Sequence, residues 1–345
     1  MIQIRYDRFA SLATGGVPAV VQGLRDALRL EFSTIPLYLY AEWSLDRTKN
    51  RVIATIIRSI VIEEMLHMAL VCNILNALGQ SPLIDDPRVV PEYPGPLPGG
   101  VESDLTVHLE PFSMAQLAVF LQIEEPEAVL NFPEHALAAA GAPVTIGQFY
   151  RELRRQLGAL TDSNFASTPR NQVDANIIEN ALPVTSVQSA QAAIDLIIRQ
   201  GEGTPVSPLE APDGGPAHYY RFNQIAKHAR LRKNPAAGPD TPPDQQYIYD
   251  GDPVPFDATG VVPAPRDPRA ANYAAGSAAR QAMDGFNNAY RDLLKALQKG
   301  FNGELDVLND AVFLNMGDLG AAGRKLMATA PAEGGPLGPS FEYAP

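Results

Sequence analysis

The sequence predicts an all-α fold, in which a four-helix bundle carries a long insertion and two extra C-terminal helices. Four segments repeat apolar residues with the period of a helix that buries one face. Glutamate and histidine residues interrupt those apolar stripes, and stretches rich in proline and glycine separate the helices. We place the bundle helices at 18–46, 50–79, 186–202 and 217–233, the insertion at 81–185 and the C-terminal helices at 270–330, all within one domain of residues 1–345.

The first predicted helix starts at Pro18, which suits a first helical turn. Glu31 lies in the middle of its apolar stripe, where an unpaired carboxylate would be costly. Glu42 shares the stripe but lies near the end of the helix, where we expect solvent, and is a weaker candidate. Tyr38 is expected to pack in the core with its hydroxyl group hydrogen-bonded.

The second predicted helix places Glu64 and His67 side by side, three residues apart, on an otherwise apolar stripe. One interpretation is a buried Glu–His hydrogen bond. The other is a metal site, because Glu-x-x-His motifs and single glutamates from facing helices are the ligands of carboxylate-bridged di-metal bundles. Other helices that carry such residues on their own stripes would favour the metal.

The third and fourth helices supply such residues. Ser186, with Thr185, is a good N-cap for the third helix. Glu202 lies on the apolar face of the third helix. An equally good interpretation of Glu202 is a surface glutamate at a fraying helix end. His218 points inward from the first turn of the fourth helix, whereas His228 lies among basic residues and is expected to be exposed.

Other polar residues have simpler interpretations. The Glu-Glu-Pro-Glu segment at 124–127 is interrupted by proline and predicts a solvated turn. His108 and His135 have no carboxylate at helical spacing, so both are expected to be structural. The two C-terminal helices carry no glutamate or histidine on their stripes, and they are expected to cover the bundle or to form the surface of a homodimer.

Composition narrows the class of partner. A net charge of −12 opposes nucleic acid and anionic membranes, which bind basic surfaces. Cys72 cannot form an internal disulfide and is expected in the core. The first residues lack a signal pattern, and we find no apolar run of the ~20 residues that cross a bilayer. These features predict a soluble, cytoplasmic protein that acts on a small molecule.

Together, the stripes predict a metal site made of Glu31, Glu64, His67, Glu202 and His218. Several segments also resemble the ferritin-like family labelled iminophenyl-pyruvate dimer synthase, which has relatives in indole alkaloid pathways such as those of violacein and rebeccamycin. These segments are EFSTIPLYL at 31–39, IEEMLHM at 62–68, QGEGT at 200–204, HYYRF at 218–222 and FNNAY at 286–290. The resemblance implies a ferritin-like bundle with an inserted region and the same five ligands.

One position departs from the pattern. Ferritin-like sites usually have a glutamate three residues before the second histidine, and here that position is Gly215. Glu31, Glu64 and Glu202 would supply a charge of only −3 against two divalent ions. Asp213 or a bound hydroxide would restore a metal pair; otherwise a mononuclear site built on Glu31, Glu64 and His67 is expected. Such ligands suit iron or manganese, and affinity alone excludes neither zinc nor copper.

With iron bound, we expect an oxidoreductase that uses O2 or peroxide to oxidise a small organic substrate, such as one derived from an amino acid, in a pocket supplied by the insertion. Two alternatives remain open. One is a non-catalytic helical protein with a degenerate metal site and a partner-binding role. The other is iron storage, which the long loops suit poorly.

Overall fold

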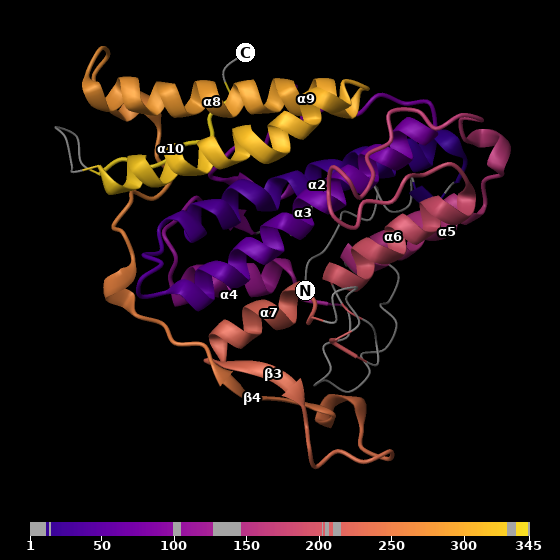
Figure 1. Ribbon diagram of the computed structural model, residues 1–345, viewed down its shortest axis with the longest axis horizontal. Coiled ribbons are helices and arrows are strands. Elements are labelled where there is room, and N and C mark those ends of the chain that lie inside the picture. Colours follow the sequence, from indigo (N-terminus) through magenta and orange to yellow (C-terminus); the bar gives the residue numbers. More distant parts are fainter. Residues whose placement is uncertain are drawn as a thin grey trace.

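The computed structural model describes residues 12–13, 15–98, 105–126, 146–201, 203, 207–209, 215–329 and 336–343. Its centre is a pair of long helices, α2 (Val17–Trp43) and α3 (Arg51–Ala77), which pack along their length (Figure 1). Within the described ranges α3 alone is long and apolar enough to cross a membrane, and 83% of its apolar window is buried inside the protein. The apolar run of α3 therefore serves the core.

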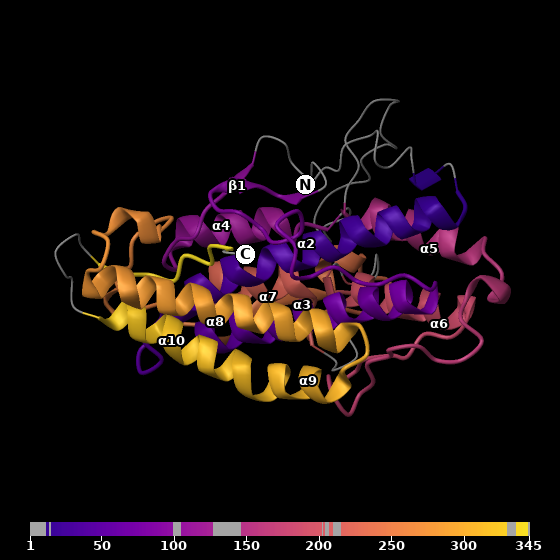
Figure 2. The same ribbon diagram turned by 90° about the horizontal axis from the view of Figure 1, so that it is seen from above.

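Four shorter helices complete the bundle in two pairs. Helices α5 (Ile146–Gly158) and α6 (Val187–Gly201) pack together near one end of the α2–α3 pair. Helices α4 (Met114–Ile123) and α7 (His218–Ala226) pack together near the other end (Figures 1 and 2). The predicted insertion thus contributes α4 and α5 to the bundle wall, although we assigned no bundle helix to residues 81–185.

Local sequence determines where these short helices begin and end. The Ser113 side chain accepts a hydrogen bond from the Gln116 amide and caps the start of α4. Pro126 disfavours helical backbone in the residue before it, so α4 ends with Glu124 as its C-cap. Ser186 likewise accepts a hydrogen bond from the Ser189 amide at the start of α6, which confirms the predicted cap.

The fourth predicted helix is wrong beyond residue 226. His228 is exposed, as expected, but its φ of 54° ends the helix, and β3 (Ala229–Lys233) follows. β3 pairs antiparallel with β4 (Tyr247–Pro253), with Leu231 opposite Tyr249. The Tyr-Ile-Tyr sequence of β4 favours a strand, and this pairing outweighs the helical pattern of the preceding residues. A second small pair joins β1 (Gly95–Pro96) to β2 (Thr106–Val107).

The C-terminal helices cover one side of the bundle (Figure 2). They are α8 (Ala278–Phe301), α9 (Leu305–Asp310) and α10 (Met316–Ala328), with a π-helical turn between α9 and α10. α8 packs against α3, and α10 packs against α2. Phe341, from the buried segment after α10, stacks on Trp43 with ring centroids 5.7 Å apart. These helices therefore cover the bundle, which was one of the two roles expected for them.

Candidate metal centre

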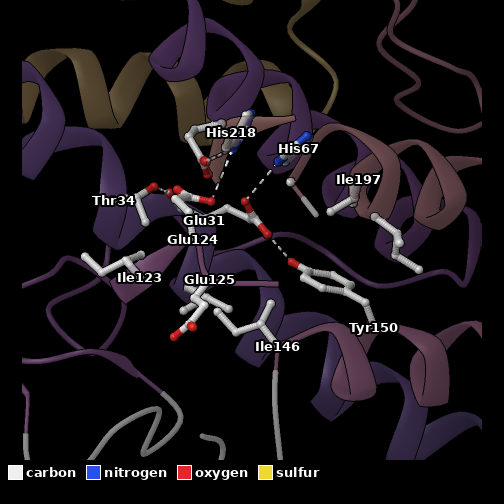
Figure 3. A pocket seen from close by; sticks show the side chains of 14 residues that line it. Glu31, Thr34, His67, Ile123, Glu124, Glu125, Ile146, Tyr150, Ile197 and His218 are labelled. Atoms are coloured by element: carbon white, nitrogen blue, oxygen red, sulfur yellow. Dashed lines mark hydrogen bonds and ion pairs between the residues drawn. The ribbon is translucent and has the colours of Figure 1, made fainter. Parts of the chain in front are cut away.

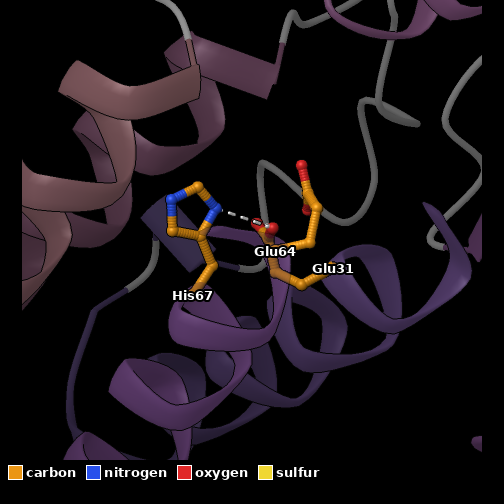
Figure 4. A group of neighbouring side chains, drawn as sticks. All are labelled: Glu31, Glu64 and His67. Atoms are coloured by element: carbon orange, nitrogen blue, oxygen red, sulfur yellow. Dashed lines mark hydrogen bonds and ion pairs between the residues drawn. The ribbon is translucent and has the colours of Figure 1, made fainter. Parts of the chain in front are cut away.

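Two groups of carboxylate and imidazole side chains meet in the middle of the bundle. One is Glu31, Glu64 and His67 (Figure 4), and the other is Glu64, Glu124 and His218. In each group the candidate ligand atoms lie within 4.8 Å of one another, so each could hold a metal ion. Because Glu64 belongs to both groups, the two candidate positions are adjacent.

The fold explains why these residues meet. The pocket around them is lined by the end of α4, the start of α5, the end of α6 and the start of α7, represented by Glu124, Ile146, Gly201 and His218. Going along the chain, α4 ends and α5 begins at the level where α2 and α3 present Glu31 and Glu64. α6 ends and α7 begins at the same level. The interruptions bring polar helix ends to a place that continuous helices would line with side chains alone.

In the first group, His67 uses its two ring nitrogens differently. Nδ1 lies 3.2 Å from Oε2 of Glu31, and Nε2 lies 3.0 Å from Oε1 of Gln200. The Tyr150 hydroxyl donates a hydrogen bond to the other oxygen of Glu31 (Figure 3). An imidazole whose outer nitrogen is fixed by a second residue is the usual arrangement of a metal-binding histidine.

The second group has the same plan. Nδ1 of His218 lies 3.0 Å from Oε1 of Glu64 and 3.4 Å from Oε2 of Glu124. Nε2 of His218 donates to Glu63, with 2.9 Å between the atoms. The Tyr38 hydroxyl donates to Oε1 of Glu124 at 2.6 Å. Each histidine therefore directs Nδ1 toward the centre, and each terminal glutamate is held by a tyrosine.

Burial sets the charge of the cluster. Burial, together with repulsion from Glu31 and Glu124, raises the pKa of Glu64 well above its usual value. Burial also acts to raise the pKa of Glu31, but contact with His67 outweighs it and the pKa is lowered. Burial acts to lower the pKa of His218, yet the surrounding glutamates raise it well above its usual value. The metal-free centre therefore holds protons at positions where cations would replace them.

The donor set fits a pair of metal ions. Nδ1 of His218 is buried and makes no hydrogen bond of acceptable geometry with any described residue, although it faces two carboxylates. The pocket at the centre has a volume of about 50 Å³, which is room for a few water-sized ligands. Mixed imidazole and carboxylate donors suit iron or manganese, and the metal's identity is not determined by these residues.

The structure brings together Glu31, Glu64, His67 and His218 from the predicted set. Glu202 lies outside the described residues, as do Asp213 and His135. Gly215 lies just before α7. The expectation of a solvated turn is wrong for Glu124, whose side chain is only 10% exposed and reaches His218. Glu124 thus joins Glu31 and Glu64, which gives three glutamates and a charge of −3 among the described residues of the centre.

Glu124 carried a signal in the sequence. It continues the buried face of α4 that includes Leu117 and Phe120, in the same way that Glu64 continues the stripe of α3. Tyr150 and Gln200 are also buried, but a tyrosine or a glutamine in a helix stripe is usually a packing residue. Glu63 lies off the main stripe of α3, and only the position of α7 reveals its role.

The remaining candidates lie outside the centre. Glu42 is buried, contrary to expectation, and pairs with Arg47. His108 is hydrogen-bonded to Asp267, with 2.6 Å between Nδ1 and Oδ2, as a structural histidine would be. Tyr38 is buried with its hydroxyl bonded, as predicted, although its partner is a residue of the centre. Cys72 is a free, buried thiol, as expected.

A family model described as "Ferritin-like" matches residues 24–227, and the chain belongs to the ferritin-like family. A crystal structure of a ferritin-like protein from Caulobacter vibrioides superposes with a TM-score of 0.64 and 25% identity, over 95% of this chain and 99% of that one. The predicted all-α ferritin-like fold is confirmed.

Two curated relatives agree with the resemblance to the dimer synthases. The chain is 24% identical over 317 residues to the dichlorochromopyrrolate synthase of Lentzea aerocolonigenes, covering 81% of this chain and 29% of that protein. It is 25% identical over 257 residues to the 2-imino-3-(indol-3-yl)propanoate dimerase of Chromobacterium violaceum, covering 61% of this chain and 23% of that protein. The chain therefore spans less than a third of the length of either relative.

Proposed function

We propose that this protein binds two metal ions, with iron the first candidate, and uses O2 or peroxide to oxidise a small organic substrate. The observation that carries the proposal is the pair of Glu/His groups that share the buried Glu64. One ion would be held by Glu31 and His67 and the other by Glu124 and His218, with Glu64 between them. Glu202 is retained as a further proposed ligand.

Bound iron would supply redox chemistry and an open position for the oxidant. The protein's own residues supply orientation and shelter. Tyr38 and Tyr150 each donate a hydrogen bond to a terminal glutamate, which limits the orientations that these carboxylates can adopt. Apolar side chains, including Ile123, Ile146 and Ile197, line the pocket and reduce its contact with bulk water (Figure 3).

The relatives suggest which substrates to try first. Their names describe the formation of a chromopyrrolate and the dimerisation of an indolyl imino acid. We therefore propose that the substrate of this chain is a small molecule derived from an aromatic amino acid. We place the substrate at the mouth of the pocket, beside the centre.

Oxygen uptake tests this function. Protein loaded with Fe(II) without oxygen is mixed with O2 or peroxide and an aromatic imino acid, and substrate loss and oxidant consumption are followed. We expect consumption of both at rates above those of Glu64→Ala, which lacks the shared ligand. Equal, background rates in the two proteins would contradict an oxidase and favour the degenerate-site alternative. Repeated iron uptake and mineral formation without substrate loss would favour storage.

A further inference from the structure

Glu63 is a partly buried acidic residue beside the centre that belongs to neither candidate metal group. It directly precedes Glu64 on α3 but turns away from the shared position and toward α7. Its Oε2 accepts a hydrogen bond from Nε2 of His218 at 2.9 Å. Its Oε1 accepts one from Nη2 of Arg221 at 2.8 Å. Both Glu63 oxygens therefore have partners on α7.

Arg221 is itself held in place, which makes Glu63 rigid. Its Nε donates to the backbone oxygen of Pro216 at 2.6 Å, and its Nη1 donates to the Ser59 hydroxyl at 3.2 Å. The Arg221 side chain is 6% exposed and that of Glu63 is 12% exposed. A charged hydrogen bond with so little access to water has a well-defined geometry. The Arg221–Glu63 pair is thus a fixed support behind His218.

The consequence for His218 is a choice between its two ring nitrogens. When Nε2–H donates to Glu63, the neutral ring carries its lone pair on Nδ1, which faces Glu64 and Glu124. The negative charge of Glu63 also makes the Nδ1 lone pair more basic, so that Nδ1 is a stronger ligand for a metal ion. His67 has a different support, because its Nε2 faces the neutral side-chain carbonyl of Gln200.

We propose that Glu63 is a positioning residue that selects Nδ1 of His218 for metal binding and makes the His218 position the charge-supported one of the two. The position at His67, supported by Gln200, does not depend on Glu63. This inference rests on the proposed metal pair. The two metal positions then differ in their supporting residue, Glu63 for His218 and Gln200 for His67. The first glutamate of the Glu-Glu-x-x-His motif on α3 thus supports a histidine on α7.

A cobalt titration of the full-length, metal-free protein tests this inference. Co(II) added without oxygen reports coordination by its visible absorption, so each position gives a binding curve and a spectrum. The variants are Glu63→Met, which removes both acceptor and charge, and Glu63→Gln, which keeps an acceptor. The control is Asp195→Asn, which removes the negative charge from a different arginine–carboxylate pair, with Arg154, outside the centre and likewise keeps an acceptor.

The expected result is that wild type and control bind two equivalents of Co(II). Glu63→Met should weaken one equivalent by about 100-fold and Glu63→Gln by about 10-fold, the range for residues that support metal-binding histidines. The other equivalent should stay within about twofold of wild type in both variants. If Glu63→Met fails to fold because Arg221 has lost its carboxylate partner Glu63, Glu63→Met/Arg221→Met removes both charges and should show the same selective loss.

Two results would overturn the inference while leaving the metal pair intact. One is wild-type binding of both equivalents by Glu63→Met. The other is equal weakening of both equivalents, which would mean that Glu63 only holds α7 against α3. A wild-type protein that binds no Co(II) would instead overturn the proposed function, and this inference with it.

Discussion

Glu64 and Glu124 show what a single residue reveals in a sequence and what it hides. Both continue a buried helical stripe, and both reach His218. Glu64 lies in mid-helix, where a carboxylate is conspicuous, whereas Glu124 precedes Glu125 and Pro126 and looks like part of a polar turn. The proline that suggests a turn is the residue that ends α4 and places Glu124 at the centre.

The role of Glu124 can be tested by removing it. Glu124→Ala should reduce the iron bound after anaerobic loading from two to one per chain, because one position loses its terminal carboxylate. Elemental analysis measures the ratio. Glu125→Ala is the control, since Glu125 lines the pocket but belongs to neither group. Two irons in Glu124→Ala would mean that Glu124 is not a required ligand and that a residue outside the described part of the chain supplies the carboxylate.

Tyr150 offers a test that needs no metal. Its hydroxyl is a donor to the buried Glu31, and a hydrogen bond to a charged group contributes about 1.5–3 kcal/mol. Tyr150→Phe should therefore lower the free energy of unfolding of the metal-free protein by about that amount. Denaturant unfolding measures it. The control Tyr343→Phe removes a bond to Asp85 at the surface and should change stability by less than about 0.5 kcal/mol. Equal effects would mean that the Glu31–Tyr150 bond has no special weight.

At the scale of elements, periodicity predicted the helices that carry a long uniform stripe. α2, α3 and α6 lie close to their predicted ranges because their apolar faces dominate. The prediction failed where the chain changes conformation within a few residues. Residues 229–233 continue a helical pattern, yet they pair with a strand that begins 14 positions later, and no local signal announces that partner. For the same reason the contribution of α4 and α5 to the bundle was missed.

The packing of α10 on α2 rests on a glycine. A Cβ atom at Gly323 would lie 2.4 Å from two ring atoms of Trp43, so Gly323→Ala should destabilise the protein by about 1–3 kcal/mol. Gly317 lies on the same helix with nothing within 4 Å of a Cβ atom. Gly317→Ala should be neutral or stabilising by up to about 1 kcal/mol. Urea unfolding of both variants measures the difference, and similar values would contradict the close approach of α10 to Trp43.

At the scale of the molecule, the bundle surrounds a group of acids that it cannot neutralise alone. Two buried glutamates, Glu31 and Glu64, and the partly buried Glu124 meet two buried histidines in the described part of the centre, and burial of such groups costs free energy unless cations compensate. The apolar stripes of α2 and α3 predicted these costly buried carboxylates. The sequence did not predict that the ends of α4 and α7 bring Glu124 and His218 to these carboxylates, because that depends on how the helix ends pack together.

Metal removal should therefore change the stability of the whole protein. A ligand present at 100 times its dissociation constant stabilises the folded state by about 2.7 kcal/mol per site. For a chain of this size, Fe(II) or Mn(II) should raise the melting temperature by several degrees, and a chelator should reverse the change. Glu64→Ala, which lacks the shared ligand, should show no such shift. A wild-type melting temperature that does not respond to metal would indicate a degenerate site.

The most direct measurement is the metal content of the wild-type protein, purified without chelators or a histidine tag and loaded with Fe(II) without oxygen. Elemental analysis of wild type and Glu64→Ala gives the number of ions per chain. Two ions in wild type and none in Glu64→Ala are expected, because both groups need Glu64. No bound metal in wild type, or the same content in both proteins, would contradict a centre built on Glu31, Glu64, His67, Glu124 and His218.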